Sequence, residues 1–274
     1  MMKLSFSTGT LYHLPLRTAF ALAREASFAG VELVLSPEII LRGAAYVRRL
    51  SQEYALPVFS VHPPIVPYPG HNSAAAVLPR LVALAEQVDC PLIVLHVPKV
   101  TAPEGPKWTE FLDTLLSERA RVNPGVQISL ENPGFFRCSD IRYILHDAHR
   151  LRAFADQYDL PITFDTAHAG SSSYPLMEAY ELFHERVVNV HFSDLVERHI
   201  FPDWPPLYSI LKHHQMPGEG ILPLVEFVQH LVVSGYSGIF TLEVSPTAIG
   251  AWSLTRMRQG LLKLVKFMRQ LEAE

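Results

Sequence analysis

The amino-acid sequence predicts an α/β fold in which strands and helices alternate along one chain. Short apolar runs recur through the 274 residues, each bounded by Pro, Gly or Asn and too short for an ordinary core helix. Segments rich in helix-forming residues separate these runs. Strands that are apolar along most of their length are typical of a parallel sheet whose outer face is covered by helices.

The expected strands number eight, and the first begins close to the N-terminus. They cover residues 3–8, 31–35, 57–62, 92–97, 126–131, 161–165, 187–192 and 238–243. Eight such units are the number that closes a (β/α)8 barrel, the TIM barrel architecture. An open doubly wound sheet is the alternative, but it would normally show a glycine-rich phosphate turn after the first strand. The segment Ser7-Thr-Gly-Thr-Leu11 does not have that pattern.

Helices are expected between the strands. Residues 19–29 are rich in helix formers and end at Gly30, and Ser36-Pro37 offers a cap residue followed by a first-turn proline. The remaining candidates are residues 74–88, 109–121, 140–157, 175–185, 222–233 and 253–272. Because we find no linker and no domain boundary, residues 1–274 are expected to form a single domain.

Two long loops follow strand ends. Residues 63–72 carry several prolines around Gly70, and we expect them to form a stiff flap over one end of the barrel. Residues 193–220 are rich in proline and contain Trp204, with a short helix expected near 206–213. Loops of this length inside a compact domain are usually functional.

Composition excludes several classes of protein. The chain is 49% hydrophobic and only 18% charged, which argues against disorder, and its net charge of -4 gives no electrostatic reason to expect nucleic acid. Two cysteines, Cys90 and Cys138, exclude a disulfide framework and a cysteine-based zinc module. The sequence shows neither a signal peptide nor an apolar run of membrane-spanning length, so we expect a cytoplasmic location and no membrane partner.

Ionisable side chains close most of the predicted strands. They are His62, His96, Glu131, Asp165, His191 and Glu243. Burying one unpaired ionisable group is costly, and the carboxyl ends of parallel barrel strands all meet at one mouth. We therefore expect these groups to compensate one another around a metal ion.

Four of these residues form an oxygen-rich set of potential ligands: Glu131, Asp165, His191 and Glu243. Three carboxylates and one imidazole suit Mn²⁺, Mg²⁺ or Co²⁺ and tolerate Zn²⁺. Nitrogen ligands for a second ion, which would then be Zn²⁺, could come from His62, His96, His168 and the pair His213-His214. A lone histidine at a strand end is more often a hydrogen-bonded residue than a ligand. A buried carboxylate needs a cation, and the strand ends offer no basic residue except Lys99.

Short motifs in a characteristic order give the chain a resemblance to the xylose isomerase-like barrel superfamily. They are Gly30-Val-Glu-Leu33, Leu130-Glu-Asn132, Phe164-Asp-Thr-Ala-His168, Val190-His-Phe-Ser-Asp194, Pro217-Gly-Glu-Gly220 and Leu242-Glu243. The superfamily holds sugar isomerases and epimerases, inosose-processing enzymes and the endonuclease IV type of apurinic-site (AP) nuclease. The resemblance implies that the four residues named above match the single-metal quartet of the isomerases. It also implies that His168 contacts substrate or a second metal.

The isomerase and epimerase branch implies proton transfer next to a carbonyl group, through an enediolate. In that branch a pair such as Glu131 and Glu243 binds the metal and also serves as acid and base on opposite faces of the substrate. We therefore expect a small sugar, sugar phosphate, polyol or inosose as substrate. A homo-oligomer is compatible with the sequence.

Basic and aromatic residues beyond the strands are candidates for substrate contacts. Lys99 and Arg198 could meet hydroxyl groups or a phosphate, although Arg198 also fits a solvated loop residue. The aromatic candidates, which also fit ordinary packing, are Trp108, Phe135, Phe136 and Trp204.

A zinc-dependent phosphodiesterase of the AP endonuclease type is the second hypothesis. That branch binds two extra zinc ions at positions that correspond to His62, His96 and Glu131, and to His168 with one of His213 and His214. It also carries an Asp two residues before the first paired histidine, where this chain has Leu211, and Asp203 is the nearest upstream carboxylate. We see no arginine-bearing loops of the kind that a DNA backbone needs. The third hypothesis is a non-catalytic barrel that binds a sugar or another partner and retains the site as a relic.

Overall fold

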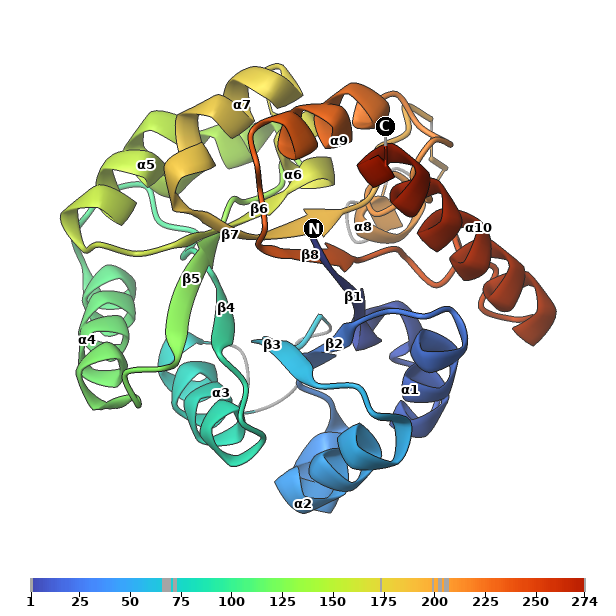
Figure 1. Ribbon diagram of the computed structural model, residues 1–274. Coiled ribbons are helices and arrows are strands. Elements are labelled where there is room, and N and C mark those ends of the chain that lie inside the picture. Colours follow the sequence, from blue (N-terminus) through green and yellow to red (C-terminus); the bar gives the residue numbers. More distant parts are fainter. Residues whose placement is uncertain are drawn as a thin grey trace.

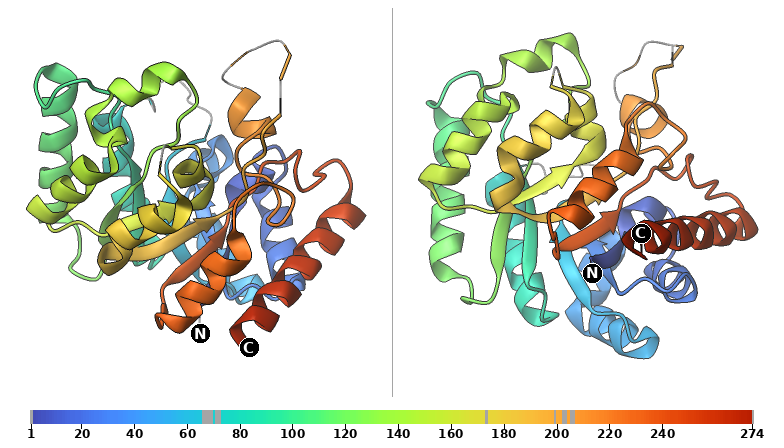
Figure 2. Two further views of the ribbon diagram at one scale, coloured as in Figure 1. Left: turned by 90° about the horizontal axis from the view of Figure 1, so that it is seen from above. Right: turned by 45° about the horizontal axis from the view of Figure 1, so that its top comes forward.

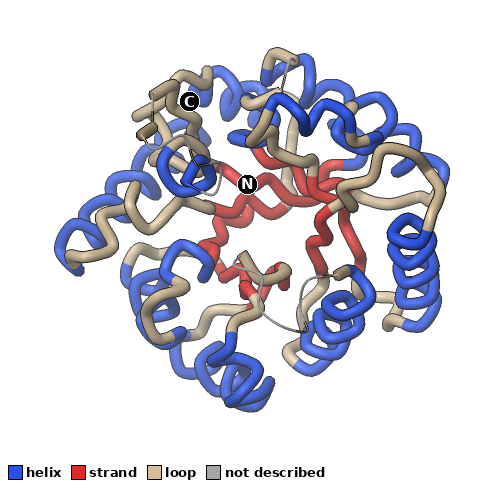
Figure 3. Tube along the Cα trace, turned by 180° about the vertical axis from the view of Figure 1, so that it is seen from behind, coloured by secondary structure: helices blue, strands red, loops and turns tan. Residues whose placement is uncertain are grey.

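Eight parallel strands close into one barrel in the computed structural model of the chain, as the sequence predicts (Figure 1, Figure 3). The structure describes residues 2–65, 70, 73–172, 174–198, 200–201, 204 and 207–273. Each strand pairs with its neighbours in sequence, and β8 closes against β1. The strands are β1 (Lys3–Ser7), β2 (Gly30–Val34), β3 (Val58–His62), β4 (Leu92–His96), β5 (Gln127–Glu131), β6 (Ile162–Asp165), β7 (Val187–Phe192) and β8 (Ile239–Leu242).

Helices surround the barrel, and both chain termini lie at the same end of it (Figure 2). The longer helices are α1 (Leu16–Glu25), α2 (Pro37–Tyr54), α3 (Ala74–Gln87), α4 (Pro106–Arg121), α5 (Ala148–Gln157), α7 (Leu176–Phe183), α9 (Leu224–Val233) and α10 (Leu254–Ala273). The short ones are η1 (Thr8–Leu11), η2 (Cys138–Arg142), η3 (Ile144–His146), α6 (Thr166–Gly170), η4 (His184–Arg186) and α8 (Tyr208–Leu211). Among the described helices, none has both the length and the apolarity that crossing a membrane requires.

Many polar side chains line the barrel interior. Because side chains alternate between the two faces of a strand, the last inward-facing side chains point into the mouth of the barrel. In β6, Phe164 faces outward and stacks on Phe227 of α9 at 5.8 Å between ring centroids. Thr163 faces inward and lies 2.7 Å from the hydroxyl of Ser129 on β5. Because successive strand residues alternate between faces, Asp165 shares the inner face with Thr163. The same two-residue spacing relates Ser129 to Glu131, Asn189 to His191 and Thr241 to Glu243.

The segment expected as one helix over residues 140–157 is instead broken into η2, η3 and α5. The Asp140 carboxylate accepts hydrogen bonds from the backbone N–H groups of Phe136 and Arg137, at 2.9 and 3.0 Å, which fixes a local turn. Tyr143 and Asp147 then adopt extended backbone, and Asp147 caps α5. The prediction of a continuous helix was wrong because aspartate side chains here compete for backbone donors.

The two long loops are described only in part. Of the flap expected over residues 63–72, residues 66–69 and 71–72 lie outside the described residues. In the loop after β7, residues 199, 202–203 and 205–206 also lie outside them, Asp203 included. The short helix expected near 206–213 is α8, which is limited to four residues.

The described end of the β7–β8 loop is organised by one buried carboxylate. Asp194 accepts hydrogen bonds from the backbone N–H groups of Leu195, Gly218, Gly220 and Leu222 at 2.8 to 3.1 Å. Gly218 has a φ of 85°, and a Cβ added to Gly220 would collide with this carboxylate. The Pro217-Gly-Glu-Gly220 motif is therefore a backbone cradle for Asp194, and Glu219 needs no chemical role.

We expect Asp194→Asn to destabilise the protein by roughly 2–4 kcal/mol, because an amide nitrogen would face backbone N–H donors that now meet carboxylate oxygens. Chemical denaturation followed by circular dichroism measures this change. Asp113→Asn on the exposed side of α4 is the control, with little expected effect. Equal denaturation midpoints for the two variants would contradict the cradle.

Candidate metal centre

Four side chains from neighbouring strand ends meet at the mouth of the barrel. They are Glu131 at the end of β5, Asp165 at the end of β6, His191 in β7 and Glu243 just after β8. Their ligand atoms all lie within 4.8 Å of one another, and all four residues are buried. The structure thus brings the predicted quartet together.

His191 is the centre of this group. Its Nδ1 atom lies 2.8 Å from Glu243 Oε2, 3.2 Å from Glu131 Oε1 and 3.9 Å from Asp165 Oδ2. Among the described residues, Asp165 Oδ2 is buried without a hydrogen-bond donor, and the nearest groups to the buried Glu131 Oε2 are the imidazoles of His96 and His62, at 3.0 and 3.6 Å. Carboxylate oxygens of this kind require a cation, so the donor set fits a divalent metal ion.

Glu32 completes the group, and the sequence reasoning missed it. Its Oε2 lies 2.9 Å from His191 Nε2 and accepts a hydrogen bond from Ser60 Oγ at 2.9 Å. With a proton on Nε2 held by Glu32, His191 Nδ1 is free to face the other carboxylates. A carboxylate behind a metal-binding histidine fixes its tautomer and orientation. A signal was present, since Glu32 is a lone carboxylate inside the apolar run Gly30-Val-Glu-Leu33.

The electrostatics of the quartet reflect an excess of buried negative charge. Burial raises the pKa of Asp165 to about 7, and the nearby Glu131 and Glu243 charges add to this effect. Burial disfavours the charged form of His191, but Glu32, Glu243 and Glu131 together hold its pKa well above the usual range. Burial likewise opposes ionisation of Glu131 and Glu243, yet contact with His191 keeps the pKa of each carboxyl low.

A second cluster adjoins the quartet through Glu131. His62 Nε2 and His96 Nε2 lie 3.6 and 3.0 Å from Glu131 Oε2, and 3.1 Å from each other. His62 Nδ1 lies 2.7 Å from the Pro63 carbonyl oxygen, which places a proton on Nδ1 and directs Nε2 towards Glu131. Two imidazoles and one carboxylate are a donor set that zinc favours.

A third cluster adjoins the quartet through Asp165. It consists of Asp165, His168 and His214. Asp165 caps α6 by accepting from the His168 backbone N–H at 2.6 Å, and His168 Nδ1 lies 3.0 Å from the Asn132 carbonyl oxygen. His214 Nδ1 lies 3.8 Å from Asp165 Oδ2.

Of the adjacent pair His213-His214, only His214 joins this third cluster. Its backbone is left-handed, with a φ of 51°. His213 instead packs on the ring of Phe136 at 4.5 Å between centroids, and burial lowers the pKa of His213 to about 2. The sequence alone does not distinguish two neighbouring histidines.

The predicted substrate contacts fall in different places. Lys99 lines a cavity beside His96, and Arg198 is exposed after β7, where it donates to Gln215 Oε1 at 3.3 Å. Trp108 packs against Phe154 of α5 at 5.5 Å between ring centroids, and also against Phe111. Of the two roles that the sequence allows for Trp108, these contacts between α4 and α5 favour ordinary packing.

The remaining aromatic candidates also have partners. Phe136 lies beside His168 at 5.9 Å between centroids, within the mouth, whereas Phe135 packs on His146. Trp204 is 55% exposed. Of these rings, Phe136 is the one in contact with the histidines of the mouth.

The sequence of the chain matches a known protein family. The profile of the xylose isomerase-like TIM barrel family matches residues 20–271, so the chain belongs to that family. An uncharacterized protein of Mycobacterium tuberculosis (strain ATCC 25618 / H37Rv) is 27% identical, with 97% of this chain and 96% of that protein covered.

Solved structures share the fold across its whole length. The D-psicose 3-epimerase of Clostridium cellulolyticum H10, crystallised with D-tagatose, superposes with a TM-score of 0.71, 14% identity and 99% of each chain covered. An AP endonuclease, family 2, from Brucella melitensis gives a TM-score of 0.71 at 18% identity, covering 97% of this chain and 99% of that one. At such identities the likeness establishes the fold and leaves the reaction open.

We expect Glu32→Gln to weaken binding of Mn²⁺ or Co²⁺ by about 10–100-fold, because a neutral amide oxygen accepts the His191 Nε2–H bond more weakly than a carboxylate does and supports that tautomer less. Competition with a metallochromic chelator measures the affinity, and the matched control is Glu226→Gln on the exposed face of α9. Unchanged affinity in a folded Glu32→Gln protein would remove Glu32 from the metal centre.

Proposed function

We propose that this protein is a divalent-metal-dependent isomerase or epimerase of a small sugar or polyol. The observation that carries the proposal is the position of Glu131 and Glu243. They come from β5 and β8, on different parts of the barrel wall, and both reach His191 Nδ1, at 3.2 and 2.8 Å. Two carboxylates around one site are what proton removal and proton return require.

In the proposed reaction, one of the two glutamates removes the proton from the carbon next to the substrate carbonyl. The electron pair of the broken C–H bond moves into the carbon skeleton, and the carbonyl oxygen takes up the negative charge. Return of a proton to the opposite face of the same carbon gives an epimer. Return of a proton to the former carbonyl carbon gives an isomer, provided that the hydroxyl proton of the first carbon passes to the former carbonyl oxygen. When bound, a divalent ion such as Mn²⁺, Mg²⁺, Co²⁺ or Zn²⁺ would stabilise that charge.

Other residues of the chain would prepare the site for this reaction. Glu32 holds the Nε2 proton of His191, so that Nδ1 faces the quartet. Asn132 bonds to the backbone of Asp165 at both its amide oxygen and its amide nitrogen, at 2.6 and 3.0 Å, which fixes β5 against β6 at the mouth. We assign His168 to the substrate or to a second ion, because its ring lies at the edge of the quartet.

A zinc-dependent phosphodiesterase is the second candidate, and one observation favours it. Glu131 and Asp165 each belong to the quartet and to a neighbouring histidine cluster, and His62, His191 and Glu243 form a further group, so the described residues form four overlapping donor sets. Such an arrangement suits more than one zinc ion. Two observations favour the first candidate: the net charge is -4, and Leu211 stands where the nuclease pattern has a carboxylate.

We expect Glu131→Gln and Glu243→Gln each to abolish exchange of the substrate α proton with deuterated solvent. The loss should exceed the ~10²–10⁴-fold usually credited to one positioned acid or base, because metal geometry suffers as well. Nuclear magnetic resonance over a panel of ketoses, aldoses, their phosphates and inososes measures the exchange. Glu226→Gln serves as the control. Near-normal exchange in both variants would show that these carboxylates are not the acid–base pair.

Metal content and DNA cleavage separate the two candidates. For the isomerase we expect about one tightly held ion per chain, any second ion being zinc, and no efficient nicking of duplex DNA at abasic sites. Elemental analysis after loading and a gel assay with an abasic duplex provide the measurements. Stoichiometric binding of two or three zinc ions together with robust nicking would reverse the ranking. No uptake of any ion would remove both.

A further inference from the structure

The side chain of Asn132 continues the pairing of β5 with β6 beyond the end of β5. The Asn132 backbone N–H still donates to the Thr163 carbonyl oxygen of β6, at 3.3 Å. The side-chain amide then bonds to the Asp165 backbone twice: its oxygen accepts from the N–H at 2.6 Å, and its nitrogen donates to the carbonyl oxygen at 3.0 Å. A side-chain amide offers the same kinds of donor and acceptor as a peptide group. It therefore holds Asp165 as a paired strand residue would.

The carbonyl oxygen of Asn132 has a different partner, the imidazole of His168. This oxygen lies 3.0 Å from His168 Nδ1, nearer than Glu131 Oε1 at 3.5 Å or Asp165 Oδ1 at 3.9 Å. Because a carbonyl oxygen can only accept, Nδ1 carries the proton. In a neutral imidazole the other nitrogen then has a free lone pair, so Nε2 is the atom left to bind a ligand.

The residues that follow Asn132 confine the same imidazole. A Cβ added to Gly134 would lie 2.5 Å from His168 Cδ2, so a side chain at this position would displace the ring. Phe136 lies edge-on to the ring at 5.9 Å between centroids. The N–H of Phe135 donates to Ser171 Oγ at 2.9 Å, and that hydroxyl donates to the His168 carbonyl oxygen at 2.7 Å. The segment after β5 thus fixes both the ring and the backbone of His168.

The carboxylate of Asp165 is fixed by the same arrangement. Its Oδ1 accepts from the His168 backbone N–H at 2.6 Å. Its Oδ2 lies 3.9 Å from His191 Nδ1 and has no hydrogen-bond donor in the described part of the chain. With the backbone held by Asn132 and Oδ1 held by α6, Oδ2 is the oxygen directed to the quartet.

We propose that Asn132 is a positioning residue that serves two groups at once. Its side-chain amide sets the place of Asp165 in the quartet, and its carbonyl oxygen selects the His168 tautomer that offers Nε2. This role rests on the proposed function only through metal binding at the quartet. Asn132 is buried, with 6% of its surface exposed, so it acts through these two partners.

The first test removes the amide and keeps the branched shape of the side chain. We expect Asn132→Leu to weaken Mn²⁺ binding by about 10–100-fold, because Asp165 loses both bonds that hold its backbone. Competition with a metallochromic chelator measures the affinity, and circular dichroism verifies the fold. The control is Tyr236→Phe, which removes a buried hydrogen bond to the Ile239 carbonyl oxygen at the other end of the barrel. This control should lower the denaturation midpoint and leave Mn²⁺ affinity within about 2-fold of the parent.

A folded Asn132→Leu protein that binds Mn²⁺ as tightly as the parent would overturn the role of the amide. The second test needs no variant of Asn132 and therefore does not depend on that protein folding. In the parent protein loaded with Mg²⁺, the imidazole ¹⁵N chemical shifts of His168 report which ring nitrogen carries the proton. The signals are assigned by their loss in His168→Phe. We expect a proton on Nδ1 and none on Nε2, and the reverse would overturn the tautomer assignment.

Neither test uses a sugar, so the outcomes separate this inference from the proposed function. Weaker Mn²⁺ binding by Asn132→Leu, with no proton exchange on any sugar by the parent, would support the positioning role and remove the isomerase. Proton exchange by the parent, with Mn²⁺ binding by Asn132→Leu that matches the parent, would support the isomerase and overturn the positioning role.

Discussion

The mouth of this barrel depends on one buried imidazole held among four carboxylates. His191 meets Glu32 through Nε2 and faces Glu131, Asp165 and Glu243 through Nδ1. All of these groups are out of water, and their negative charges outnumber the nearby positive ones unless histidines take up protons or a cation binds. The raised pKa of His62, about 9 despite the opposing effect of burial, is one sign of that imbalance. A divalent ion relieves it directly, which is why the donor set indicates a metal centre.

The polar interior of the barrel makes such a centre possible. Hydrogen-bonded pairs between neighbouring strands, such as Ser129 with Thr163 and Asn189 with Thr241, fill the layer beneath the quartet. These pairs satisfy the Ser129, Thr163 and Thr241 hydroxyls, while Asn189 Nδ2 has no partner within the described part of the chain. The residue two positions further along each of these strands directs an ionisable side chain to the same point. Glu131 and Asp165 each belong both to the quartet and to a neighbouring group with two histidines, so the donor groups adjoin one another through shared carboxylates.

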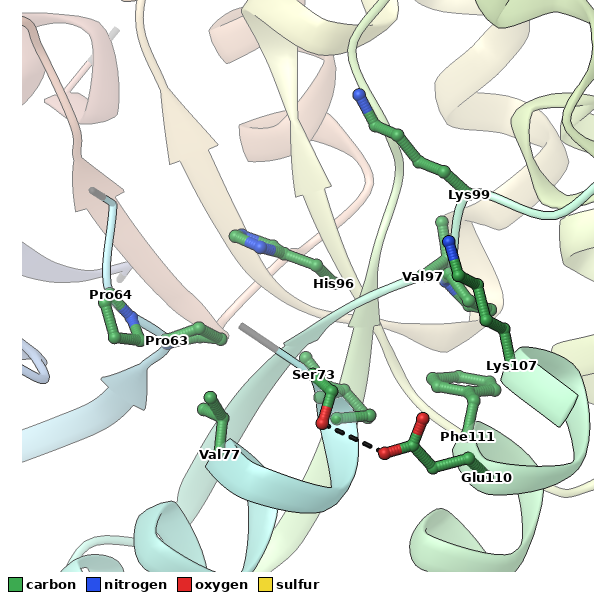
Figure 4. A pocket seen from close by; sticks show the side chains of 13 residues that line it. Pro63, Pro64, Ser73, Val77, His96, Val97, Lys99, Lys107, Glu110 and Phe111 are labelled. Atoms are coloured by element: carbon green, nitrogen blue, oxygen red, sulfur yellow. Dashed lines mark hydrogen bonds between the residues drawn. The ribbon is translucent and has the colours of Figure 1, made fainter. Parts of the chain in front are cut away.

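Loops beyond the strands surround the quartet on two sides. The Asp194 cradle holds the chain in an antiparallel bridge with Gln215, and that bridge positions His214 next to Asp165. On the other side of the quartet, beyond Glu131, His96 lines a cavity together with Lys99 and Lys107 (Figure 4). The quartet is thus built from strand ends, whereas the residues around it come from the loops after β4 and β7.

The sequence by itself determined the barrel and the identity of the quartet, because alternation along parallel strands places every strand-end residue at one mouth. The catalytic and ligand roles of these residues stay predictions. Glu32 was not predicted, because its strand continues past it with Leu33 and Val34 and it therefore does not stand at a strand end. Its role depends on His191 of β7, which is distant in sequence. The tertiary structure alone decided three further points: the broken helix of residues 140–157, the packing of Trp108, and the choice of His214 over His213. They depend on a local hydrogen bond, on a neighbouring ring and on a left-handed φ, respectively. None of these features produces a periodic pattern of residues, so the sequence pattern does not predict them.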